Sequence, residues 1–87
     1  MINLIKVEYK KGKEKAVIMA ERVGINVTLK LFSTDIFKRT KQEFMLAVPF
    51  KDYENELEGI GNMLVEKGYS FKNANGRFEP PESDPNE

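Results

Sequence analysis

The sequence predicts an α+β domain: a split βαβ, or ferredoxin-like, sandwich in which two helices cover one face of a four-stranded antiparallel sheet. Alternating apolar and polar residues indicate strands at 5–9 and 25–31. Apolar residues at helical spacing indicate a helix after Asp52. A helix stop followed directly by a strand occurs twice, at 21–25 and 66–69. We therefore expect the order strand, helix, strand, strand, helix, strand.

Residues 13–24 follow Gly12 and allow two interpretations. As a helix, the segment ends at a glycine cap, Gly24, and presents one apolar stripe. That stripe comprises Ala16, Met19, Ala20 and Val23. As a strand, the segment returns from a tight hairpin at Gly12 and pairs with the first strand. Helix propensity favours the first interpretation. The second gives a β-meander followed by one helix.

The third strand is expected at 44–48, where the run of apolar residues is nearly continuous. Such a run is typical of a central strand that is buried on both faces. Pro49 follows at its end, where the loss of a backbone donor is tolerated. The connection before this strand is polar and basic, and it contains Lys38, Arg39 and Lys41.

The second helix is expected to begin at Asp52 and to end at 67–68. Its apolar stripe comprises Tyr53, Leu57, Ile60 and Leu64. Gly61 lies on the same stripe, and we attribute it to a close approach between the helix backbone and the sheet. A short last strand is expected to open at Tyr69, followed by a turn at 73–76.

Length and charge bound the organisation of the chain. Eighty-seven residues suffice for a single domain, which we place at 1–79, followed by a disordered, acidic and Pro-rich tail at 80–87. Residues 1–51 carry eleven Lys/Arg and five Asp/Glu, a net of +6, whereas residues 52–87 carry three and nine, a net of −6. This division predicts a basic surface on a neutral chain, and it also favours self-association.

The chain has no histidine and no cysteine. The commonest general base, the thiol nucleophile and the usual transition-metal ligands are therefore missing together, so we expect no enzyme, no cofactor and no metal site. Glu54 and Glu58 lie one helical turn apart, but an acidic first turn suits the helix dipole without a cation. Without cysteine, and without an apolar run that spans a bilayer, the sequence favours a cytoplasmic protein with no membrane partner.

Helices on one side of a sheet leave its other face uncovered, and strand alternation places lysines there around a small apolar centre. We expect a small non-catalytic binding or accessory protein that docks a protein partner through this lysine-rimmed face or through a strand edge. The residues expected to contact the partner are Lys6, Lys10, Lys30, Lys38, Arg39, Lys41, Met45 and Lys72. Lysines that are merely solvated explain the same positions without a partner.

Two other partners fit the same pattern. Nucleic acid is one, bound without sequence preference through lysine contacts with phosphates. The segment 41–48, however, lacks the glycine and the paired aromatic residues with which RNA-binding domains of the RRM type stack bases. A second copy of the chain is the other, because the two halves carry opposite charge and one strand is apolar. Such a homodimer would form sheet to sheet or edge to edge.

Overall fold

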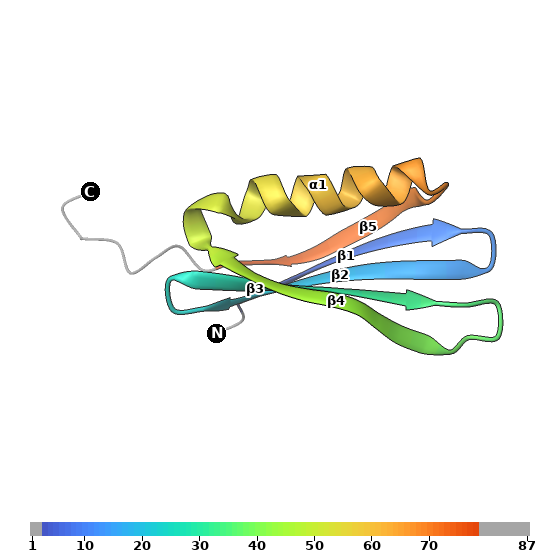
Figure 1. Cartoon of the computed structure of the whole chain (residues 1–87), viewed down its shortest axis with the longest axis horizontal. Coiled ribbons are helices and arrows are strands. Elements are labelled where there is room, and N and C mark those ends of the chain that lie inside the picture. Colours follow the sequence, from blue (N-terminus) through green and yellow to red (C-terminus); the bar gives the residue numbers. More distant parts are fainter. Residues whose placement is uncertain (1–2, 79–87) are drawn as a thin grey trace.

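The computed structural model describes residues 3–78, and the predicted tail at 80–87 lies outside this range. Four strands joined by hairpins come first: β1 (Leu4–Lys11), β2 (Glu14–Val23), β3 (Asn26–Thr34) and β4 (Thr40–Pro49). A short 3-10 turn, η1 (Phe50–Asp52), leads into the helix α1 (Tyr53–Glu66), and β5 (Ser70–Arg77) ends the fold. Figure 1 shows α1 lying along one face of the sheet.

All five strands belong to one antiparallel sheet with the order β4-β3-β2-β1-β5. The first four strands form a meander, and β5 returns beside β1 after the helix. β4 and β5 are therefore the two edges of the sheet. The β1–β2 and β3–β4 hairpins lie at one end of the molecule, and the β2–β3 turn lies at the other (Figure 1).

The predicted ferredoxin-like fold is wrong, because the sheet has five strands and residues 14–23 form β2 instead of a helix. Side chains along β2 alternate between the two faces. Ala16, Ile18 and Ala20 are buried against α1, whereas Met19 lies on the opposite face and is half-buried. The predicted helical stripe is thus divided between two faces. Helix propensity is a weak preference, and pairing of β2 with strands on both sides overrides it.

Both turns that flank β2 are two-residue hairpin turns that begin with glycine. Gly12 opens the first turn with φ of +61°, and Gly24 opens the second with φ of +64°. A positive φ at the first turn position alone is typical of a type II′ turn, whose twist matches that of the flanking strands. Gly24 is therefore a hairpin residue, and its predicted role as a helix cap is wrong.

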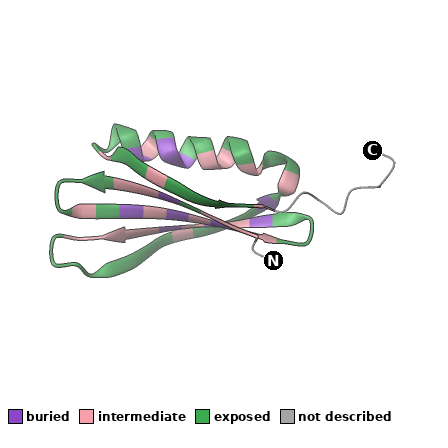
Figure 2. Cartoon of the chain, turned by 180° about the vertical axis from the view of Figure 1, so that it is seen from behind, coloured by how far each residue is buried: buried purple, intermediate pink, exposed green. Residues whose placement is uncertain are grey.

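The core is a single layer between the sheet and α1. Its buried side chains are Val7, Ala16, Ile18, Ala20, Val27, Leu29, Leu31, Val48, Ile60 and Leu64. Tyr53 and Leu57 pack against this layer, which confirms the predicted apolar stripe of α1. In Figure 2, buried residues concentrate in the inner strands and on the side of α1 that faces them, whereas β4 is exposed along most of its length.

Two strand assignments need correction. The run 44–48 is predicted to be central and buried on both faces, but β4 is an edge strand in which only Val48 is buried. The turn predicted at 73–76 is also wrong, because β5 continues through this segment and pairs with β1. A β-bulge in that pairing leaves Lys72 as the extra residue between Phe71 and Asn73.

Gly61 is buried on the side of α1 that faces the sheet, and the predicted close approach there is confirmed. A Cβ atom at this position would clash with the hydroxyl oxygen of Tyr9. The Tyr9 ring in turn packs edge-on against Phe71, with 5.9 Å between ring centroids. The side chain of Tyr9 therefore fills the space that a larger residue at Gly61 would need.

Gly61→Ala should stabilise the chain only when the Tyr9 hydroxyl is removed. In the Tyr9→Phe background we expect the helix-propensity gain of about 1 kcal/mol over glycine. In the natural background the new Cβ must displace the hydroxyl, so this gain should be lost. Urea unfolding of the four proteins measures the difference. An equal effect of Gly61→Ala in both backgrounds would show that the close contact is absent.

Candidate partner-binding surface

The sheet face opposite α1 has no other element over it within residues 3–78, and we call it the open face (Figure 1). Directly opposed residues in antiparallel strands share a face, so the strand pairing arranges the side chains in rows across the sheet. One row on the open face consists of Asn75, Lys6, Met19, Lys30 and Met45. The next row consists of Asn73, Glu8, Val17, Phe32 and Gln42.

The open face is hollowed near its centre into a shallow depression of about 380 Å³. Its floor is apolar and is formed by Val17, Met19 and Phe32, which are only half-buried. Lys6 and Lys15 also line it, and both are exposed. Glu8, Thr34 and Thr40 line the rest of it, so the depression combines an apolar floor with a polar wall that contains two lysines and one glutamate.

Basic residues dominate the open face. Lys10 of β1 lies directly opposite Lys15 of β2, so two like charges meet across the strands. Such a pair opposes strand association. The helix has the opposite character, since α1 contains four glutamates and no lysine or arginine. The basic part of the sequence thus forms most of the sheet layer, and the acidic part forms the helix layer.

Half of the predicted contact residues meet on the open face. These are Lys6, Lys10, Lys30 and Met45. Lys41 belongs to β4 and pairs with Ser33, which lines a pocket under α1, so Lys41 lies on the helix side of the sheet. Lys72 occupies the bulge of β5 at the far edge from Met45.

The sequence analysis does not predict several residues of the open face, and these include the whole apolar floor. Val17, Met19 and Lys15 are missed because β2 is interpreted as a helix. Phe32 is missed because the second predicted strand ends at Leu31, whereas β3 continues to Thr34. The alternation of Thr28 and Lys30 continues to Phe32, so the sequence does contain the signal that places this ring on the open face.

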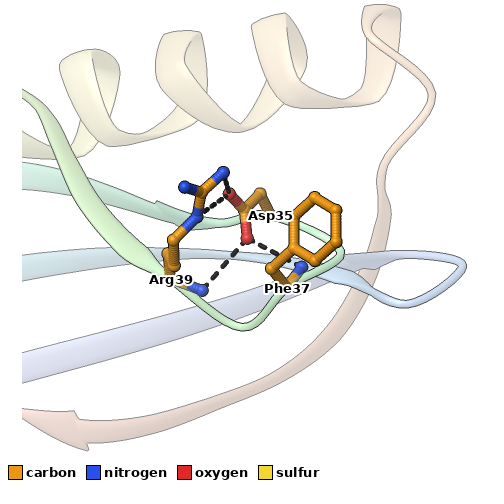
Figure 3. Close-up of polar contacts among 3 residues, drawn as sticks. All are labelled: Asp35, Phe37 and Arg39. Carbon is orange, nitrogen blue, oxygen red and sulfur yellow. Dashed lines mark hydrogen bonds and ion pairs between the residues drawn. The ribbon is translucent and has the colours of Figure 1, made fainter.

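Lys38 and Arg39 lie in the tight loop between β3 and β4, which is organised by the carboxylate of Asp35 (Figure 3). The backbone N–H groups of Phe37 and Arg39 donate to Asp35 Oδ1 at 2.8 and 3.0 Å. Asp35 Oδ2 accepts from Nε of Arg39 at 2.8 Å and pairs with its Nη2 at the same distance. The charge of Arg39 is therefore engaged within the loop.

Two apolar side chains protrude from this loop. Ile36 is 58% exposed and Phe37 is 70% exposed. The Arg39 guanidinium lies 5.2 Å from the centroid of the Phe37 ring, which holds the ring beside the ion pair. Lys38 follows with φ of +63°, a backbone conformation that few non-glycine residues adopt. The loop thus presents an apolar tip that its own hydrogen bonds hold in place.

A second hollow of about 250 Å³ lies on the helix side of the sheet, between β3, β4 and the end of α1. Ser33 and Glu43 are hydrogen-bonded to each other in its wall, near Lys67 and Tyr69. Burial raises the pKa of Tyr69, and the charges of Glu14 and Glu43 add to this effect. Alternation with Met45 and Ala47 would place Glu43 on the open face, but the bulge in β4 directs it to the helix side.

Comparisons with known proteins add no functional information. The sequence matches no family model, and neither a curated protein nor a solved structure matches it. Within residues 3–78, no three His, Cys, Asp or Glu side chains are grouped so that they could hold a metal ion. The same part of the chain contains no helix with the length and apolar character needed to cross a membrane.

The loop at Asp35 should respond to acid. Hydrogen bonding from the backbone N–H of Arg39, together with the other contacts with Arg39 and Phe37, lowers the pKa of Asp35 below 3.8. Because the folded pKa is the lower one, the loop contacts are fully present above pH 3.8 and are lost as the pH falls through the folded value. We expect the amide NMR signals of Phe37 and Arg39 to titrate with a midpoint below 3.8.

Asp35→Asn should abolish that titration and weaken the contacts of Arg39. The amide of Gly24, in the turn at the opposite end of the sheet, serves as the control signal and should not follow the same curve. A midpoint at or above 3.8 would mean that the Asp35 carboxylate does not hold the loop in solution.

Proposed function

We propose that this chain is a small, non-catalytic binding protein that docks an acidic segment of another protein on its open face. The observation that carries the proposal is the uncovered apolar floor of Val17, Met19 and Phe32 between exposed lysines. An apolar centre within a polar rim is the usual anatomy of a protein interface. The lack of cysteine suits a reducing compartment, and we include a cytoplasmic location in the proposal.

The charges of the open face favour an acidic partner over a neutral one. Lys6, Lys10, Lys15 and Lys30 outnumber the glutamates of the same face, Glu8 and Glu21. The opposed pair of Lys10 and Lys15 repels within the free chain, and a carboxylate placed between the two ammonium groups would relieve that repulsion. Exposed lysines around an apolar centre should mainly accelerate association and make it sensitive to salt.

Nucleic acid is a second candidate, and the position of Phe32 favours it. An aromatic ring on a basic sheet face can stack a base while neighbouring lysines contact phosphates. The ring of Phe32 is half-buried, however, and lies in its row between Val17 and Gln42. An apolar side chain of a peptide fits such a floor better than a flat base, so we favour the protein partner.

Charge reversal on the open face tests the proposal. The probes are a peptide library with acidic residues around apolar anchors, and single-stranded poly(dT), each at low and near-physiological salt. We expect acidic peptides with an apolar anchor to be selected, and their affinity to fall by about tenfold or more in the Lys6→Glu/Lys30→Glu variant. Met19→Asp should also abolish binding, because it places a charge in the apolar floor.

The matched control is Lys51→Glu/Lys67→Glu, which makes the same change in net charge at two exposed positions outside the open face. The control should bind the selected peptides like the natural chain. Equal losses in both double variants would refute a specific site on the open face. Tight, salt-sensitive binding of poly(dT) together with failure to select any peptide would replace the protein partner with nucleic acid.

A further inference from the structure

The outer edge of β4 is unusually open for a sheet edge. Eight of its ten residues are exposed, and the exceptions are Phe44, which is half-buried, and Val48, which is buried. Met45 is 61% exposed and Leu46 is 41% exposed, although both are large and apolar. Natural sheet edges usually carry charges, prolines or bulges, because their unpaired backbone groups otherwise recruit another strand.

The features that discourage pairing with another strand occur on β4 only at the two ends of its apolar run. The bulge at Glu43 precedes residues 44–48, and Pro49 follows them. Between these two features no charged residue interrupts the run Phe-Met-Leu-Ala-Val. The segment 44–48 is therefore a bounded, unprotected strand edge of five residues.

The other edge of the sheet is built differently. β5 carries Lys72 and Arg77 as well as polar side chains, and its only large apolar residue is Phe71. A bulge at Lys72 and a positive φ of +86° at Gly76 distort its backbone. By the same criteria β5 is a protected edge, so the exposed apolar edge belongs to β4 alone among the described strands.

We propose that residues 44–48 of β4 pair with residues 44–48 of a second copy of this chain, antiparallel about a two-fold axis at Leu46. The two sheets then become one continuous sheet. The proposal stands independently of the docking partner suggested above, because it uses the backbone edge of β4 and not the apolar floor of Val17, Met19 and Phe32.

The choice of a second copy rests on the self-complementarity of this segment. With Leu46 opposite Leu46 of the second copy, Phe44 lies opposite Val48 and Met45 lies opposite Ala47. Residues 44, 46 and 48 share the helix side, whereas 45 and 47 share the open face, so every opposed pair joins two apolar side chains on one face. No other register of the strand keeps all five residues paired with one another.

Within residues 44–48 the same register brings no charged side chains together. Glu43 falls outside the paired segment, at the bulge, where it is hydrogen-bonded to Ser33. Lys30 lies on β3, so the two Lys30 residues are separated by three strand spacings, about 14 Å. That distance exceeds the screening length of about 10 Å at moderate salt. Repulsion between the two basic faces is therefore weak across the axis.

The dimer explains why Leu46 and Met45 are exposed in the single chain. Leu46 lies on the helix side but at the outer edge of the core, where α1 leaves it partly uncovered. Pairing places the second Leu46 against it and extends the apolar layer from one copy to the other. On the opposite side, the two open faces become one surface with Met45 and Ala47 of both copies at its centre.

Solution mass is the first part of the test. Light scattering or sedimentation equilibrium of the full chain should give twice the monomer mass of 10.0 kDa, falling to the monomer on dilution. Leu46→Lys, which opposes two ammonium groups at the axis, should give a folded monomer. The matched control is Val65→Lys, at an exposed apolar position of α1, which should remain dimeric.

Cross-linking then tests the register, and it does not depend on a variant that disrupts the fold. The chain has no cysteine, so introduced thiols report cleanly. Leu46→Cys should oxidise to a disulfide-linked dimer, because directly opposed residues of antiparallel strands lie within disulfide range. Met45→Cys should cross-link efficiently with Ala47→Cys in a mixture of the two variants, and Asn75→Cys on β5 should not cross-link.

A monomer at every concentration would overturn the proposal, and so would a Leu46→Lys variant that stays dimeric. A dimer cross-linked through Asn75→Cys would move the interface to β5 and also refute it. If the chain is monomeric but binds an extended peptide that Leu46→Lys abolishes, β4 pairs with a strand of another protein instead of a second copy.

Discussion

The structure depends on one constraint: a single helix can cover only one face of a five-stranded sheet. Alternating side chains on one side of β1, β2 and β3 are buried by α1, and they supply most of the core. Within residues 3–78 no second layer covers the other side, yet it carries Val17, Met19 and Phe32. The candidate docking surface exists because β2 and β3 carry apolar side chains on both faces, while the helix covers only one of them.

Because of this topology, the basic and acidic residues, which lie in different parts of the sequence, also lie in different layers of the folded chain. The basic part of the sequence forms the four-stranded meander, and the acidic part begins with α1, which folds back over it. Charges that would average out in a mixed sequence are therefore presented on opposite layers of the molecule. A chain with no net charge can in this way attract an acidic partner on one side and repel it on the other.

The sequence predicts the elements whose pattern is unambiguous. The helix at 53–66, its buried stripe and the tight contact at Gly61 follow from helical spacing, and the strands around Val7 and Leu29 follow from alternation. Residues 14–23 satisfy both patterns, because Ala16 and Ala20 are four positions apart. That spacing brings two side chains to the same face of a helix and, since it is an even number, also to the same face of a strand. Only the strands on either side decide between helix and strand, and no local pattern contains that information.

The same limit applies to the candidate site. Lys6, Lys30 and Met45 are placed on the open face by alternation alone, whereas the apolar floor depends on the identity of β2. An apolar run such as 44–48 does not reveal whether it is central or an edge, because its partners come from elsewhere in the chain. The exposed edge of β4 is therefore visible only in the folded structure.

Thiol labelling of single-cysteine variants at neighbouring positions of β2 would show which face of the sheet is covered and which is open. We predict that the thiol of Met19→Cys, on the open face, reacts much faster than the thiol of Ile18→Cys, whose natural side chain is 1% exposed under α1. Neither the proposed dimer nor the hairpin turns cover Met19. Comparable protection at both positions, or faster reaction at position 18, would contradict a sheet with one covered and one open face.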